Sequence, residues 1–160
     1  MDSKLRPLIH IGFPKAASTW LQRGLFSDEK AGLIAPWGVQ AGEAVEQFAL
    51  PNPFRFSAES ARKVFELGLE EAARRSLVPV LSHEMLTGDQ MKGFYWGKEV
   101  ADRIHVIFPD AKILIFIREQ KSMIWSSYQQ YLKEGGVLTL QRYIDPGVKK
   151  AGSFRLAMIN

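Results

Sequence analysis

Three short apolar runs, each followed by polar or small residues, stand out along the chain. They cover residues 8–13, 78–81 and 113–117, and each contains β-branched side chains. Near-continuous apolar character over so few residues is typical of strands that are buried on both faces of a parallel sheet. We therefore predict that the three runs are buried strands of one sheet.

Four other segments have the apolar spacing or the end signals of helices. In one of them Val100, Ile104 and Ile107 recur three or four residues apart, and Pro109 follows. Proline cannot continue a helix because it lacks the backbone N–H. The predicted helices are residues 18–26, 57–75, 98–108 and 119–133.

Strands that alternate with helices predict an α/β fold, in which a mostly parallel sheet has flanking helices. A chain of 160 residues has the size of one domain, so we assign residues 1–160 to a single domain. Residues 30–56 contain several prolines and glycines, which predicts a long irregular crossover. Ligands of such sheets bind at the carboxyl ends of the strands, where the three apolar runs stop.

The composition is globular, with 46% apolar and 24% charged residues. No apolar run is long enough to span a membrane, and no secretory signal is evident, so we expect a cytoplasmic protein. The absence of cysteine excludes disulfides, thiolate metal ligands and a cysteine nucleophile. The net charge of +4 is spread along the chain, which does not favour nucleic acid and suits a small, highly anionic ligand.

The stretch after the first predicted strand has the character of an anion-binding loop. Small residues lead into a helix there, where free backbone N–H groups and the helix dipole attract anions, and Lys15 adds a full charge. The stretch does not match the nucleotide-binding P-loop, because Ala17 and Ser18 occupy the positions of the second glycine and the lysine. A standard ATP or GTP site is therefore not predicted.

Residues 14–20, Pro-Lys-Ala-Ala-Ser-Thr-Trp, instead resemble the 5′-phosphosulfate loop of the sulfotransferase family, which reads Pro-Lys-x-Gly-Thr/Ser-Thr-Trp. The one departure is Ala17 in place of the usual glycine. A second match is Arg118, directly after the third predicted strand, with Ser126 eight residues later. The family binds the 3′-phosphate of its sulfuryl donor with an arginine and a serine at this spacing, although Ser127 is an adjacent alternative.

A third segment, residues 81–84, follows the second predicted strand and contains His83 and Glu84. Sulfuryl transfer needs a general base, and family members use a histidine or a glutamate at about this place. We favour Glu84, with His83 as the alternative, since alternation along an extended segment would point only one of them into the cleft. The competing interpretation is a salt bridge for Glu84 and a helix cap from its neighbours.

The resemblance implies a P-loop-NTPase-like three-layer sandwich and a sulfotransferase that uses 3′-phosphoadenosine-5′-phosphosulfate as donor, without a metal. The product of the donor would be adenosine 3′,5′-bisphosphate. The acceptor would be a hydroxyl or amine of a small molecule, a lipid or a glycan. The implied catalytic residues are Lys15, Glu84 and His83, and the implied donor-binding residues are Lys15, Ala16, Ala17, Ser18, Thr19, Trp20, Arg118 and Ser126.

The resemblance covers residues 8 to about 134 and lacks the later glycine-rich basic loop of the family, so it matches the N-terminal portion of the family domain. Two alternatives stay open. One is a non-catalytic nucleotide-binding or anion-binding module, or a truncated inactive homologue. The other is a P-loop kinase-like, ATP-dependent phosphotransferase. His10 and His105 have no partner at ligand spacing, so we expect both to be structural.

Overall fold

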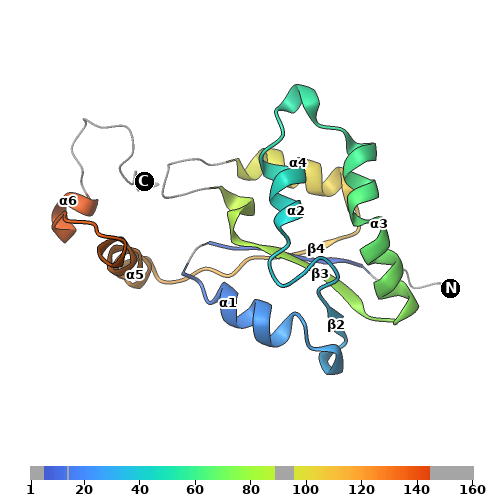
Figure 1. Cartoon of the computed structure of the whole chain (residues 1–160), viewed down its shortest axis with the longest axis horizontal. Helices are drawn as coiled ribbons and strands as arrows, with labels where there is room; N and C mark the ends of the chain where they lie inside the picture. The colour runs from blue at the N-terminus through green and yellow to red at the C-terminus, as the bar shows by residue number, and fades with distance from the viewer. Residues whose placement is uncertain (1–5, 14, 89–95, 145–160) are drawn as a thin grey trace.

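A computed structural model describes residues 6–13, 15–88 and 96–144. Its centre is a four-stranded, all-parallel sheet in the order β2-β3-β1-β4. The strands are β1 (Leu8–Ile11), β2 (Leu33–Ile34), β3 (Val78–His83) and β4 (Lys112–Leu114). The sheet is flanked by helices (Figure 1), so the predicted α/β fold with a mostly parallel sheet is confirmed.

Three of the four predicted helices agree with the structure to within a residue or so, and the fourth, at 18–26, is divided into an α-helical and a π-helical part. The α-helices are α1 (Ser18–Trp20), α2 (Gly42–Ala44), α3 (Ala58–Arg74), α4 (Gly97–Ile107), α5 (Gln120–Lys133) and α6 (Leu140–Ile144). The π-helical segments η1 (Leu21–Leu25) and η3 (Val45–Ala49) continue α1 and α2. Short 3-10 turns are η2 (Glu29–Ala31), η4 (Pro53–Arg55) and η5 (Glu84–Thr87).

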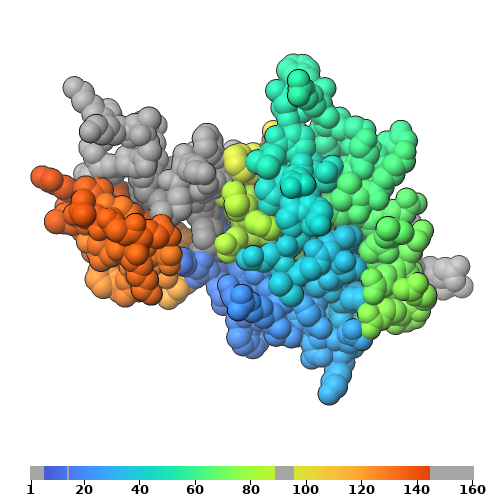
Figure 2. Space-filling view, in the orientation of Figure 1, coloured from blue at the N-terminus to red at the C-terminus, as the bar shows by residue number. Residues whose placement is uncertain are grey.

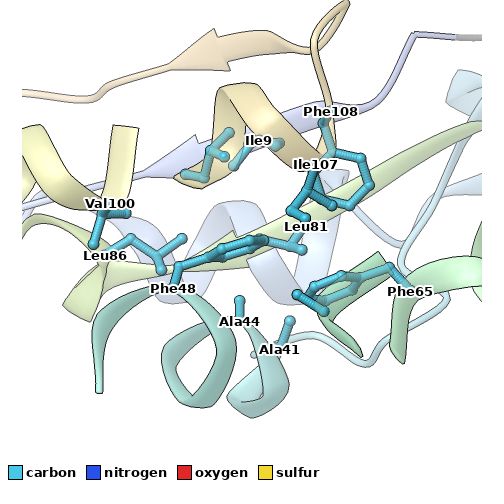
Figure 3. Packing of buried hydrophobic residues seen from close by; sticks show 12 residues of the cluster. Ile9, Ala41, Ala44, Phe48, Phe65, Leu81, Leu86, Val100, Ile107 and Phe108 are labelled. Atoms are coloured by element: carbon cyan, nitrogen blue, oxygen red, sulfur yellow. The ribbon is translucent and has the colours of Figure 1, made fainter. Parts of the chain in front are cut away.

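Buried side chains pack on both faces of the sheet, because successive strand residues point to opposite sides. On one face Ile9 and Leu81 pack with aromatic rings from η3, from α3 and from the end of α4 (Figure 3). The rings of Phe48 and Phe65 are stacked there, with 5.3 Å between their centroids. On the other face Val80 packs against the segment that contains α1 and η1 (Figure 1). The second buried cluster comprises Leu21, Phe26 and Val80.

The prediction of an irregular crossover over residues 30–56 is wrong. This stretch contains the edge strand β2 and the continuous helical segment of α2 and η3. Ala41, Ala44, Val45 and Phe48 are all buried, and they follow the i, i+3, i+4, i+7 spacing of a helix face. The glycines and prolines on either side end this helix rather than preventing it.

The prediction that residues 113–117 form a strand buried on both faces is also wrong. Only residues 112–114 belong to β4, and Ile113, Ile115 and Ile117 are 49%, 49% and 79% exposed. The physical reason is that β4 is an edge strand, which pairs with β1 alone among the described strands. The sequence specified an apolar strand correctly but not its place in the sheet.

Helices α5 and α6 pack against each other to one side of the sheet, and in Figure 2 they form a separate orange and red lobe. Aromatic rings join them, since the Tyr143 ring lies 5.4 Å from that of Tyr128 and 5.1 Å from that of Tyr131. The extended segment 115–119 connects this lobe to β4. Across the described ranges, none of the helices is both apolar enough and long enough for a membrane crossing.

Candidate functional site

The loop of residues 12–18, here called the β1 loop, begins at the carboxyl edge of the sheet. Ile11 at the end of β1 pairs with His83 at the end of β3, so the residues that follow both strands lie at the same edge. Lys15 and Ala17 in this loop have φ angles of 65° and 64°. These left-handed conformations bend the chain sharply between the strand and α1. Pro14 lies outside the described residues.

Two residues from separate sequence motifs meet at the β1 loop. Nη1 of Arg118 donates a hydrogen bond to the backbone oxygen of Lys15 at 3.1 Å. The Lys15 ammonium in turn lies 3.4 Å from Oε1 of Gln130 on α5. The structure therefore brings together the lysine of the first motif and the arginine of the second, which are 103 residues apart. Gln130 is a contact that no pattern in the sequence identified.

Ser126, the other residue of the second motif, is half-buried on α5, and its neighbour Ser127 is buried. Within the described part of the chain, neither hydroxyl is hydrogen-bonded to Lys15 or Arg118. The structure thus places Arg118 at the loop and leaves the choice between the two serines open.

The residues that follow Lys15, up to the end of α1, differ strongly in exposure. Ala16 and Ser18 are buried, whereas Ala17 and Thr19 are exposed and Trp20 is 70% exposed. The Ser18 hydroxyl is notable, because its oxygen has no hydrogen-bond partner among the described residues. A buried hydroxyl without a partner costs free energy, so it is a group that a bound ligand would satisfy.

The turn η5 is tied directly to the β1 loop. The Thr87 hydroxyl lies 3.1 Å from the backbone oxygen of Gly12 and 3.2 Å from that of Glu84, so its single proton is shared between two acceptors. Thr87 thereby positions the turn that contains Glu84 next to the loop. No sequence pattern predicts this role, since an isolated threonine after a strand is common.

His83 and Glu84 have different local roles. His83 caps η5: its Nδ1 accepts a hydrogen bond from the backbone N–H of Met85 at 3.1 Å. Burial lowers the pKa of His83, and the nearby charge of Glu84 acts in the opposite direction. The expectation that both residues alternate along an extended segment is wrong, because the strand ends at His83 and Glu84 begins a 3-10 turn.

Within residues 6–13, 15–88 and 96–144, no group of three or more histidine, aspartate or glutamate side chains is arranged to hold a metal ion. Comparisons with known proteins identify no relative. No protein-family model matches the chain, and neither the curated proteins nor the solved structures contain a match.

Proposed function

We propose that the chain is a sulfotransferase that binds 3′-phosphoadenosine-5′-phosphosulfate at the β1 loop, on a P-loop-NTPase-like three-layer sandwich. The observation that carries the proposal is the hydrogen bond from Arg118 to the backbone of Lys15, at 3.1 Å. It brings the cationic residues of both motifs to the same edge of the sheet, where each would bind one of the two phosphates of the donor. Arginine suits a phosphate because its planar fork donates two charge-assisted hydrogen bonds.

The β1 loop also fits the phosphosulfate end of the donor. The buried Ser18 hydroxyl has no hydrogen-bond partner in the described part of the chain, and Lys15 provides a positive charge at the same loop. The donor would supply a sulfuryl group on a good leaving phosphate. Lys15 would stabilise the negative charge that develops on that phosphate, an electrostatic role of the kind that dominates many catalysed transfers. Ala16, Ala17 and Thr19 would contribute backbone N–H groups, whereas the N–H of Trp20 already donates to the backbone oxygen of Ala17 at 3.1 Å.

The contacts of η5 favour Glu84 over His83 as the general base. The lone pair on Nδ1 of His83 is already used to cap the turn, so a proton could be accepted there only if the cap broke. Glu84 is held next to the loop by Thr87. In the proposed step the acceptor oxygen or nitrogen bonds to sulfur, the bond from sulfur to the phosphate oxygen breaks, and Glu84 takes the acceptor proton.

The products would be a sulfate ester or sulfamate and adenosine 3′,5′-bisphosphate. The acceptor would be a hydroxyl or amine of a small molecule, a lipid or a glycan. Residues 30–56 and 85–97 are the candidate segments for its pocket, and of these residues 89–95 lie outside the described part of the chain.

Ligand titration distinguishes this function from the alternatives. Calorimetry would compare adenosine 3′,5′-bisphosphate with ATP, each with and without magnesium. We expect the bisphosphate to bind tightly without metal. Preference for ATP with a magnesium requirement would instead identify a kinase-like phosphotransferase. Bisphosphate binding without any sulfuryl transfer to a panel of phenols, alcohols and amines would identify a binding module.

Replacing Lys15 tests the mechanism. In Lys15→Ala we expect turnover to fall about a hundredfold or more, by analogy with the loss of one group that stabilises transition-state charge. Affinity for the unreacted donor should fall less, because the charge that Lys15 stabilises develops only during transfer. Arg118→Ala should mainly weaken binding.

Lys30→Ala is the matched control, since Lys30 is an exposed lysine on η2, outside the site. Its turnover and affinity should equal those of the unmodified protein. Unchanged turnover in purified Lys15→Ala would refute the mechanism.

A further inference from the structure

A buried polar network lies directly beneath the β1 loop. His10, in the middle of β1, has no exposed surface, and its Nδ1 lies 2.8 Å from the hydroxyl oxygen of Ser82. Ser82 is the residue paired with His10 on the neighbouring strand β3. Gln22 on η1 donates a second hydrogen bond to the same hydroxyl, at 3.0 Å. The rings of Phe26 and Phe116 pack against the imidazole.

Hydrogen-bond counting assigns the imidazole proton. The Ser82 hydroxyl oxygen accepts a hydrogen bond from Gln22. Among the described residues, the acceptor for the hydroxyl proton is Nδ1 of His10. If Nδ1 carried a proton instead, the Ser82 proton would be buried without an acceptor. Burial also lowers the pKa of His10 and so favours the neutral ring. The neutral tautomer that satisfies Ser82 therefore carries its proton on Nε2.

Nε2 of His10 and the Ser18 hydroxyl face the same point. Both atoms are buried, and neither has a hydrogen-bond partner within the described residues. A β-carbon built on Gly12 would lie 3.0 Å from Nε2 and 3.3 Å from the Ser18 hydroxyl oxygen. Two polar groups without partners, one from the sheet and one from α1, thus converge under Gly12.

We propose that His10 is a positioning residue for anion binding: its Nε2–H donates to the Ser18 hydroxyl, which in turn donates its proton to the bound phosphate. The proposal rests on the proposed function in that it requires an anion at the β1 loop. A phosphate oxygen only accepts hydrogen bonds, so the serine must present its proton to it. A donor behind the serine oxygen sets that orientation and polarises the hydroxyl. The two groups are not hydrogen-bonded to each other in the structure, so the proposal requires the Ser18 side chain to rotate about its Cα–Cβ bond when the anion binds.

Two substitutions of His10 separate this role from simple packing. The amide of His10→Gln carries an N–H group near the position of Nε2, whereas His10→Asn carries polar atoms only near the position of Nδ1. Both remove the aromatic ring, so they share any packing loss. We expect His10→Asn to weaken binding of adenosine 3′,5′-bisphosphate about tenfold, as for one hydrogen bond to a charged group. His10→Gln should stay within about threefold of the unmodified protein.

The coupling to Ser18 is the second measurement. Ser18→Ala should weaken binding about tenfold, and adding His10→Asn to it should weaken binding no further, because the two residues act in series. Equal affinities of His10→Asn and His10→Gln would overturn the proposal, and so would independent, additive losses with Ser18→Ala. Thermal denaturation of each variant confirms that the compared proteins are folded.

Nitrogen-15 NMR of the histidine rings tests the role of His10 independently of the proposed sulfotransferase function. We expect an Nε2–H tautomer for His10 and a shift of that proton on addition of inorganic pyrophosphate, absent in Ser18→Ala. Binding of pyrophosphate with this shift, without binding of the bisphosphate, would support the role of His10 and refute the sulfotransferase. An Nδ1–H tautomer would overturn the role of His10 alone. Failure of both anions to bind would refute both.

Discussion

Ala17 has an unusual backbone for a residue with a β-carbon. Its φ angle of 64° lies in the left-handed region, where the β-carbon crowds the backbone. The sulfotransferase loop has glycine at this position, and glycine adopts that conformation without strain. The difference between Ala17 and the family pattern is therefore a matter of backbone strain as well as of space near a ligand.

Ala17→Gly should stabilise the protein. Relief of the left-handed strain outweighs the added flexibility of the unfolded chain, so we expect the free energy of unfolding to rise by about 0.5–1 kcal/mol. Urea denaturation would measure the change. Ala16→Gly is the neighbouring control, because Ala16 does not have a positive φ angle and should lose about 0.5–1 kcal/mol. A loss of stability in Ala17→Gly would contradict the strain argument.

The sequence allowed the positions of two candidate site residues to be predicted, because a motif fixes their place relative to a strand. Lys15 and Arg118 follow β1 and β4, and the parallel sheet places both strand ends at one edge. Thr87 and Gln130 could not be predicted, because their contacts depend on how η5 and α5 pack against the loop. His10 was expected to be structural, and its network with Ser82 depends on strand register, which no local pattern specifies.

At the scale of elements, the sequence predicted best where a segment determines its own structure. Helix α3 has a serine cap, Ser57, whose hydroxyl accepts from the Ser60 N–H at 3.2 Å, and a buried apolar face. Both signals are local. The exposure of β4 could not be predicted, because it depends on which strands pair with it.

At Gly68, α3 lies directly against the indole of Trp37, in the segment after β2. A methyl group there would overlap the indole of Trp37, which packs edge-on against Phe65 at 5.5 Å between ring centroids. We expect Gly68→Ala to lower the free energy of unfolding by about 1–3 kcal/mol, the usual cost of overpacking. Thermal or urea denaturation would measure it.

Gly24→Ala provides the control for Gly68→Ala. Gly24 also lies in a helical segment, but its β-carbon would meet nothing within 4 Å. The substitution should raise stability by about 0.5–1 kcal/mol, as for alanine in place of an unconstrained helical glycine. Equal effects of the two substitutions would show that helix propensity, rather than contact with Trp37, determines the result.

For the whole molecule, the buried histidines predict a loss of stability in mild acid. Burial lowers the pKa of His10 and of His83 from the ordinary value of 6.5. Between that value and the lowered pKa the unfolded chain binds protons that the folded chain does not, so the free energy of unfolding falls as the pH falls. The loss should begin as the pH drops through about 6.5.

Urea denaturation at intervals from about pH 8 to pH 5 would measure this slope. The glutamine of His10→Gln does not titrate, so this variant should show a smaller change in the free energy of unfolding with pH. The carboxylate of Glu119, which caps α5, affects stability at lower pH. Hydrogen bonds from Ser122 hold its pKa at about 2 instead of 4.5. Its contribution is lost below pH 4.5. A free energy of unfolding that does not change between pH 8 and pH 5 would contradict the prediction for the histidines.

The exposed edge of β4 has a consequence for aggregation. No strand of the described residues pairs with its outer side, and a run of apolar, β-branched residues at such an edge is a template on which other chains can add strands. Lys112 and Arg118 flank residues 113–117, and like charges at such positions repel a second copy. Arg118 would then protect against self-association in addition to its proposed role in phosphate binding. If a substitution or a bound anion neutralises the charge of Arg118, one of the two charges that oppose self-association is lost.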